Sequence, residues 1–282
     1  MQSPLEQETL FEEKSFRSFL SFINENFGLE LSWYNRNSLQ RRLQKVVRQF
    51  RLSDLRSLQM LMLRDEKYFQ NFVDLFTVQV TELFREPLSL LELRKEVLPF
   101  FRDKSELKVL QVGASTGEEL SSLCILLDEE GILEESKITS TDLSLTALEK
   151  AKRPCISKAR IKEAEMNYRK SGGEGLLPDY YQATSSLCFF HESLFKNVDY
   201  KLFDLTKDEL GQKFDIILCR NLLIYFKVNQ QHQLLDRLLR HLNPGGFLIL
   251  GEQESVSFYQ NHENLQIVSS SQKIFRQNLI AP

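Results

Sequence analysis

The sequence contains none of the long apolar runs, signal-like starts or paired cysteines that mark membrane and secreted proteins. In 282 residues, no apolar run approaches the roughly 20 residues that span a bilayer. Residues 1–14 lack a basic start and an apolar core, so we expect no secretory signal. The cysteines (Cys124, Cys155, Cys188 and Cys219) are far apart, which predicts free thiols in a reducing compartment, the cytoplasm.

Histidine is also scarce, and the net charge is small. The four histidines (His191, His232, His241 and His262) have no ligand-like grouping, so we expect no metal site. A formal net charge of -3 gives no overall attraction to nucleic acid. Hydrophobic residues make up 42% of the chain and charged residues 27%, proportions that are typical of a soluble globular protein.

Residues 1–90 lack any strand pattern and carry apolar residues at helical spacing. The spacing predicts one helix from Phe16 to Phe27 and a second over Asn37–Phe50. A third begins after the cap-like Ser53-Asp54 and runs through Leu63, and a fourth covers Glu66–Phe76. We therefore expect a small all-helical domain over residues 1–90. A second domain would occupy residues 91–282.

The second predicted helix carries positive charge that no nearby acid compensates. Its region contains no acid between Leu31 and Ser53, but it contains Arg36, Arg41, Arg42, Lys45, Arg48 and Arg51. Such a helix suits an acidic partner or phosphates, although a solvated helix face is an equally good explanation. Nucleic acid is the less favoured partner, because the patch has no interleaved aromatic residues and the chain is net acidic.

From residue 107 onward the pattern changes to alternating strands and helices. We expect strands at Leu107–Val112, Lys137–Thr141, Lys213–Cys219, Phe247–Leu250 and near Gln266–Arg276, with helices between them. This alternation predicts an α/β domain, a Rossmann-like doubly wound parallel sheet with helices on both faces. Leu187–Phe195 and Val198–Phe203 predict an antiparallel β hairpin inserted at about residues 184–204, either a decoration or an edge that binds a partner.

Three polar features fall at the carboxyl ends of predicted strands, where doubly wound sheets bind ligands. A glycine-bounded turn, Gly113–Gly117, ends the first strand, Asp142 ends the second, and Arg220-Asn221 ends the Lys213 strand. Asp142 suits the two ribose hydroxyls of a nucleoside, but it suits the cap of the following helix equally well. Together the three features favour a nucleoside-bearing cofactor.

The residues of the turn indicate which cofactor it suits. The turn reads G-A-S-T-G rather than G-x-G-x-x-G, and no Gly-Lys-Ser/Thr follows, which excludes a P-loop. Glu118 and Glu119 would repel a diphosphate but suit a ligand with a positive amino group. S-adenosyl-L-methionine fits, and Arg85 is a candidate partner for its carboxylate. No nucleophile–base grouping is evident, and methyl transfer to a nucleophilic acceptor needs mainly alignment, which supplies roughly 7–11 kcal/mol.

With these residues in hand, the chain resembles the chemotaxis receptor methyltransferases, the CheR family. Five motifs match in order: Thr81–Glu86 (TELFRE) resembles T-x-F-F-R-E, and Gly113–Glu119 (GASTGEE) resembles G-C-S-T-G-E-E. Thr141–Leu143 (TDL) is similar to T-D-I, Ile217–Phe226 (ILCRNLLIYF) to C-R-N-V-L-I-Y-F, and Leu242–Gly251 (LNPGGFLILG) to L-x-P-G-G-x-L-x-x-G. The likeness covers almost the whole chain. It departs at Ala114, Leu120, Ser121 and Leu83, and at Asp204, where the family has asparagine.

The resemblance implies methyl transfer from S-adenosyl-L-methionine to glutamate side chains of chemoreceptors, leaving S-adenosyl-L-homocysteine. It also implies which residues contact the cofactor: Thr81 and Arg85 at its methionine part, Glu118 at its amino group, Gly113 and Gly117 in the turn beneath it, Asp142 at the ribose, and Asp204 and Leu205 near the adenine. Arg220 and Asn221 would lie along the cleft, and Arg85 and Tyr225 would lie at the reacting centre. An ionised Asp204 accepts a hydrogen bond from the adenine amino group but cannot donate one.

The resemblance also implies partners. The basic helix around Arg41, Arg42, Lys45 and Arg48 corresponds to the receptor-docking helix of the family, and the β insertion to a subdomain that holds a receptor tail in some members. Two alternatives stay open: a module that binds the cofactor without turnover, and a methyltransferase with another acceptor. Nothing in the sequence fixes the oligomeric state.

Overall fold

The computed structural model describes residues 12–77, 81–256, 259 and 264–279. The chain divides into two compact units, Met1–Val78 with Tyr225–Gln230, and Gln79–Ile224 with Gln231–Pro282. The division lies at residue 78 rather than near residue 90. The reason is that Leu83, Phe84 and Leu90, together with the residues up to Phe101, pack into the core of the second unit.

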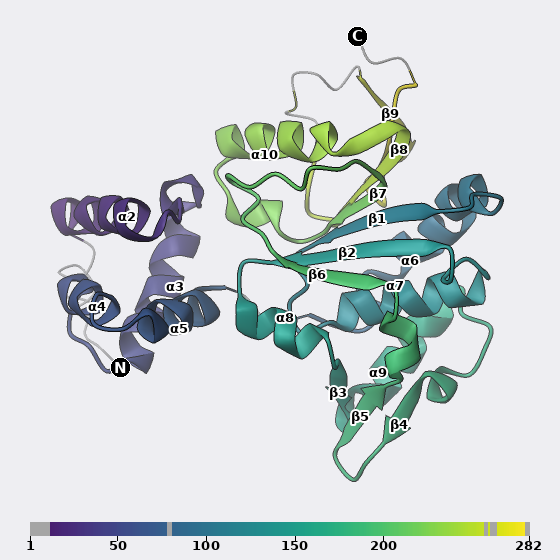
Figure 1. The fold of residues 1–282 in the computed structure, drawn as a ribbon, viewed down its shortest axis with the longest axis horizontal. Helices are drawn as coiled ribbons and strands as arrows, with labels where there is room; N and C mark the ends of the chain where they lie inside the picture. The colour runs from purple at the N-terminus through teal and green to yellow at the C-terminus, as the bar shows by residue number, and fades with distance from the viewer. Residues whose placement is uncertain (1–11, 78–80, 257–258, 260–263, 280–282) are drawn as a thin grey trace. The chain divides into compact units, whose positions relative to one another are not determined.

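The first unit consists of four α-helices in its described part, with a short 3-10 helix (Leu31–Trp33) between the first two. They are α2 (Glu13–Phe27), α3 (Arg36–Gln49), α4 (Leu55–Met62) and α5 (Glu66–Phe76), as the apolar spacing predicts (Figure 1). Local signals fix their ends: Gly28 ends α2 at φ 65°, and the side chains of Asn35, Asp54 and Asp65 cap the N-termini of α3, α4 and α5.

The second unit is built on a seven-stranded sheet with the order β6-β2-β1-β7-β8-β10-β9. The strands are β1 (Leu107–Val112), β2 (Ser136–Asp142), β6 (Val198–Leu202), β7 (Phe214–Cys219), β8 (Leu242–Leu250), β9 (Leu265–Ser269) and β10 (Ile274–Gln277). The first five are parallel, and β10 pairs antiparallel with both β8 and β9. This confirms the predicted Rossmann-like class.

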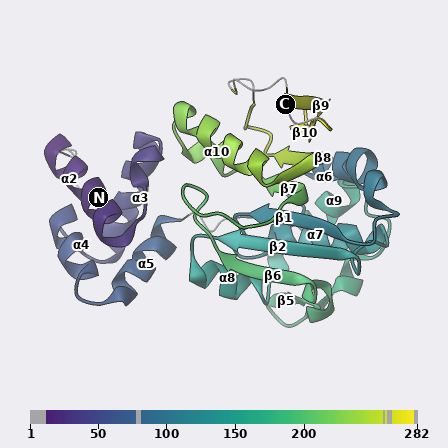
Figure 2. The same cartoon turned by 45° about the horizontal axis from the view of Figure 1, so that its top comes forward.

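Helices cover both faces of this sheet. They are α6 (Pro87–Glu92), α7 (Glu118–Glu129), α8 (Leu145–Ala151), α9 (Ile161–Lys170) and α10 (Val228–Arg240). Figure 2 shows α7 and α8 on one side of the sheet and α10 on the other. The sheet order reverses between β1 and β7, so the carboxyl ends of β1, β2 and β7 meet at the point where such folds bind ligands.

The small antiparallel sheet is present, but the predicted hairpin is wrong. Val198–Leu202 is an edge strand of the main sheet, parallel to β2, while β5 (Leu187–Phe190) lies between β3 (Cys155–Ser157) and β4 (Tyr181–Ala183). A 3-10 helix, Glu192–Phe195, separates β5 from β6 and prevents a tight turn. The Asn197 side chain donates to the carbonyls of Leu133 and Glu134, which directs β6 toward β2.

Two further expectations are corrected. The last segment, near Gln266–Arg276, is a hairpin of β9 and β10 rather than one strand, with a register irregularity after Ile274. Residues 153–205 also contain α9, which sequence patterning did not reveal. Its buried face is narrow, because Ala164 and Tyr168 are its buried residues.

Candidate functional site

The turn between β1 and α7 leaves backbone exposed to open space. Gly113 has φ 90°, and a Cβ placed there would meet nothing within 4 Å. Gly117 has φ 93°, but a Cβ there would lie 2.9 Å from Ala151 Cα and from Pro154 Cβ. Gly117 therefore packs the turn against the C-terminal end of α8 and the residues that follow it, whereas Gly113 borders open space.

Asp142 ties this turn to the end of β2. Its Oδ2 accepts a hydrogen bond from Ser115 N at 2.8 Å, and its Oδ1 accepts one from Ser144 N at 2.9 Å. The cap of α8 is Ser144, whose Oγ accepts from Ala147 N at 3.0 Å. Asp142 is therefore not the helix cap that the sequence left as an alternative. It lies beside the turn because β1 and β2 pair in register up to Val112 and Thr141.

Asp204 and Leu205 follow β6 at the neighbouring strand end, and both are buried. Asp204 Oδ1 accepts from the backbone N and the Oγ1 of Thr206, at 2.9 and 2.6 Å. Its Oδ2 is buried and has no hydrogen-bond partner among the described residues. A buried carboxylate oxygen without a donor is costly, so this atom suits a ligand N–H such as an adenine amino group.

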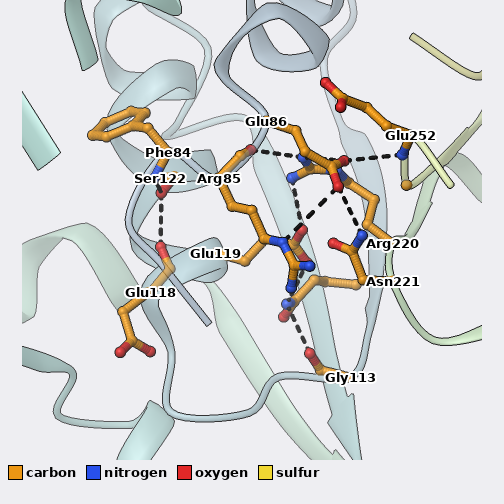
Figure 3. Close-up of polar contacts among 12 residues, drawn as sticks. Phe84, Arg85, Glu86, Gly113, Glu118, Glu119, Ser122, Arg220, Asn221 and Glu252 are labelled. Atoms are coloured by element: carbon orange, nitrogen blue, oxygen red, sulfur yellow. Dashed lines mark hydrogen bonds and ion pairs between the residues drawn. The ribbon is translucent and has the colours of Figure 1, made fainter. Parts of the chain in front are cut away.

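The two acids at the start of α7 have different surroundings. Glu119 accepts from Gln111 Nε2 at 3.0 Å and from Arg220 Nη1 at 2.8 Å, so both of its oxygens have protein partners. Glu118 accepts from Thr116 Oγ1 at 2.5 Å, and burial raises the pKa of its carboxyl group. Figure 3 shows Glu118 apart from the contacts around Arg220. A buried acid of this kind gains most from a cationic ligand group.

Arg220 binds neighbouring protein groups through both of its terminal nitrogens, while its buried Nε has no hydrogen-bond partner among the described residues. Its side chain is 0% exposed; Nη1 binds Glu119, and Nη2 donates to the Arg85 carbonyl at 2.7 Å and to Glu86 Oε2 at 3.1 Å (Figure 3). Asn221 Nδ2 donates to Glu86 Oε1 at 2.7 Å. Arg220 therefore braces the segment that carries Arg85.

Arg85 is the freer cation of the two. Its side chain is 35% exposed, and its Nε lies 3.9 Å from Glu86 Oε1. The residues on either side, Phe84 and Glu86, both have φ 52°, a strained conformation that turns the chain sharply around Arg85. Thr81 lies at the start of this segment. Its backbone carbonyl accepts hydrogen bonds from Arg160 Nη2 at 3.2 Å and from Arg160 Nη1 at 3.3 Å.

Tyr225 belongs to the first unit, where it packs against Arg42. The Arg42 guanidinium lies 4.0 Å from the Tyr225 ring centre and 5.3 Å from that of Phe76, and its Nη1 donates to the Phe76 carbonyl at 3.4 Å. Burial lowers the pKa of Arg42. The expectation that Arg42 lies on the exposed basic face is wrong, because it shares the buried stripe of α3 with Leu39, Leu43 and Val46.

Sequence reasoning missed two carboxylates of this region, Glu86 and Glu254. Glu86 lies inside the TELFRE motif, which was the available signal, and it accepts from Arg220, Asn221 and the Glu252 backbone N. Within the described residues, no group of three His, Cys, Asp or Glu side chains is arranged to hold a metal. In the same part of the chain, no helix has the length and apolar character of a membrane span.

Comparison with known proteins identifies the family. Residues 79–274 match the model for the S-adenosylmethionine-binding domain of CheR methyltransferase, and residues 14–77 match the model for its all-alpha domain. The chain belongs to the CheR methyltransferase family. Cher3 of Pseudomonas putida is 34% identical over 93% of this chain and 96% of its own length. Chemotaxis protein methyltransferase 1 of Vibrio cholerae is 27% identical (87% and 90% covered), and the chemotaxis protein methyltransferase of Listeria innocua is 26% identical (86% and 91%).

The family confirms a methyltransferase that uses S-adenosyl-L-methionine, and the described residues fit that cofactor. Asp204 Oδ2 offers a buried acceptor, Gly113 borders open space, and Glu118 offers a buried acid. These three features suit an adenine amino group, a nucleoside body and an ammonium group respectively.

Proposed function

We propose that this CheR-family methyltransferase methylates glutamate side chains in the cytoplasmic domains of chemoreceptors. The observation that carries the proposal is the similarity, over most of both chains, to proteins described as chemotaxis methyltransferases. The products would be glutamate methyl esters and S-adenosyl-L-homocysteine. The enzyme would act in the cytoplasm, where the receptor domains lie.

The reaction requires alignment more than acid–base chemistry. A glutamate is ionised at neutral pH, so its carboxylate oxygen can attack the methyl carbon directly. The cofactor, when bound, would supply a methyl group on a positively charged sulfur, and that sulfur would keep the electron pair of the carbon–sulfur bond, so no proton transfer would be needed. The residues of the site therefore need only hold two reactants in line and exclude water.

The cofactor contacts that the family resemblance implies have support from the geometry. Asp142 would bind the ribose while still holding the turn, Asp204 would accept from the adenine amino group, and Leu205 would pack nearby. Glu118 would face the ammonium group. The partly exposed Arg85, rather than the buried Arg220, would orient the cofactor carboxylate.

Three remaining residues have proposed roles that rest on the family motifs. Thr81 would lie at the methionine end of the cofactor, Tyr225 would line the reacting centre, and Asn221 would border the cleft. Asn221 has geometric support as well, because its side chain is held by Glu86, the residue that follows Arg85.

The proposed docking face consists of three exposed basic residues of α3, Arg41, Lys45 and Arg48. Their spacing, i, i+4 and i+7, places them on one side of the helix, opposite the stripe that buries Arg42. A row of exposed cations complements an acidic receptor helix and steers its approach.

The decisive assay incubates the protein with labelled S-adenosylmethionine and a panel of receptor cytoplasmic fragments, and then measures base-labile methyl esters. We expect label on at least one receptor. Cofactor binding without label on any receptor would contradict the proposal and favour a binding module. Label on another protein or a small carboxylic acid, found by product mass spectrometry in cell extract, would identify a different acceptor.

A further inference from the structure

The turn that follows β7 is built around a buried carboxylate, Glu254, which is 3% exposed. Glu254 Oε2 accepts from Gly251 N at 2.6 Å and from Asn221 N at 3.0 Å, and its Oε1 accepts from Leu223 N at 2.6 Å. Three backbone donors from the ends of two adjacent parallel strands therefore converge on one side chain. Hydrogen bonds to an ionised acceptor are stronger than those to a neutral one.

The same strand ends approach each other so closely that residue 251 must be glycine. A Cβ at Gly251 would lie 2.6 Å from Asn221 Nδ2 and 2.8 Å from Asn221 N. Asn221 itself has φ 57°, which is uncommon for a residue with a side chain. This conformation persists because Glu254 binds its backbone while Glu86 binds its side chain.

We propose that Glu254 is a positioning residue that fixes Asn221 and the turn after it, and through Asn221 aligns Glu86 and Arg85 at the cofactor cleft. The inference rests on the proposed function, which places Asn221 and Arg85 at that cleft. The turn after β8 also binds Glu86 directly, because the backbone N of Glu252 donates a hydrogen bond to Glu86 Oε2 at 3.1 Å. Figure 3 shows Glu86 between Arg220, Asn221 and Glu252.

The state of the Glu254 carboxyl group then decides the geometry of the turn. Burial raises its pKa to about 7, although the backbone donors lower it. A protonated carboxyl would present an O–H toward backbone N–H groups, and one of the three contacts would be lost. The nearby titratable and charged groups are Cys219, Glu119, Glu86 and Arg220. Burial also raises the pKa of the Cys219 thiol. Arg220 forms ion pairs with Glu86 and Glu119.

The test compares E254Q with E252Q by calorimetric titration with S-adenosylhomocysteine between pH 6 and pH 8.5. E252Q is a matched control, because it changes only an exposed side chain and keeps the backbone N that binds Glu86. We expect E254Q to bind S-adenosylhomocysteine about tenfold more weakly than wild type at pH 8. The affinity of wild type and of E252Q should change with pH in the same way, and E254Q should lose the part of this change that comes from Glu254. Burial also raises the pKa of Glu118, so the difference between variants is the informative quantity. Binding by E254Q with wild-type affinity and wild-type pH dependence would overturn the proposal.

A second measurement needs no variant and covers the case in which E254Q does not fold. In the ¹⁵N-labelled wild-type protein, the amide signals of Gly251, Asn221 and Leu223 should titrate together with a midpoint near pH 7. Amide signals that do not move between pH 5 and pH 9 would overturn the proposal. Both readouts work without an acceptor, so a failure to methylate receptors would count against the proposed function and not against Glu254.

Discussion

Glu254 gives the sharpest prediction about stability, because its folded and unfolded pKa values differ and its burial is nearly complete. The ordinary carboxyl pKa is 4.5, and burial raises it to about 7 in the folded protein. At one pKa unit per 1.36 kcal/mol, ionising this group in the folded state costs about 3 kcal/mol. The stabilising contribution of the protonated group is fully present below pH 4.5 and is lost as the pH rises through about 7.

The assay measures how the difference in unfolding free energy between wild type and E254Q changes with pH. Urea unfolding of wild type, E254Q and E252Q at several pH values gives a free energy of unfolding for each. The stability of wild type relative to E254Q should fall by roughly 2–3 kcal/mol between pH 5 and pH 8, because glutamine does not titrate. The E252Q control should follow wild type within about 0.5 kcal/mol, as exposed substitutions usually do.

The probe must report the second unit. The single tryptophan, Trp33, lies in the first unit, so its fluorescence reports that unit alone, whereas circular dichroism reports both. The expected pH effect should appear in the dichroism transition and be absent from the fluorescence transition if the units unfold separately. A wild-type-minus-E254Q difference that stays constant from pH 5 to pH 8 would refute the reasoning.

Three further predictions concern binding. Asp142→Ala should weaken S-adenosylhomocysteine binding at least tenfold by calorimetry, because each lost charge-assisted hydrogen bond is worth roughly 1.5–3 kcal/mol; unchanged affinity would remove Asp142 from the site. Asp204→Ala should weaken binding about tenfold, with little effect for analogues that lack the adenine amino group, because the free acceptor oxygen is removed. Equal losses for both ligands would contradict the contact. Reversing Arg41, Lys45 and Arg48 to glutamate should impair receptor methylation at low salt and spare cofactor binding; normal methylation would refute the docking role.

Local signals in the sequence determined most of the elements. The apolar spacing and the capping residues Asn35, Asp54 and Asp65 fix the helices of the first unit without reference to the rest of the chain. The strand–turn–helix around Gly113 and Gly117 is equally local, because positive φ values at these positions favour glycine. The family motifs, read in order, identified the methyltransferase class and its cofactor.

Pairing and orientation were decided only by the tertiary structure. Whether Val198–Leu202 pairs with β5 or with β2 depends on contacts between residues far apart in the chain, and β propensity is the same in either case. A run of basic residues likewise does not reveal which one faces inward, and Arg42 turns inward because its helical position falls on the apolar stripe.

The same distinction holds within the site. The sequence determined that acids, arginines and glycines gather at the ends of the central strands, since strand ends of a parallel sheet share one edge. Only the folded structure decided which of them are committed to protein partners, because a hydrogen bond is set by distance and not by sequence spacing. Arg220 and Glu119 bind each other, Glu254 holds the turn after β7, and Arg85, Glu118 and Asp204 Oδ2 keep capacity for a ligand.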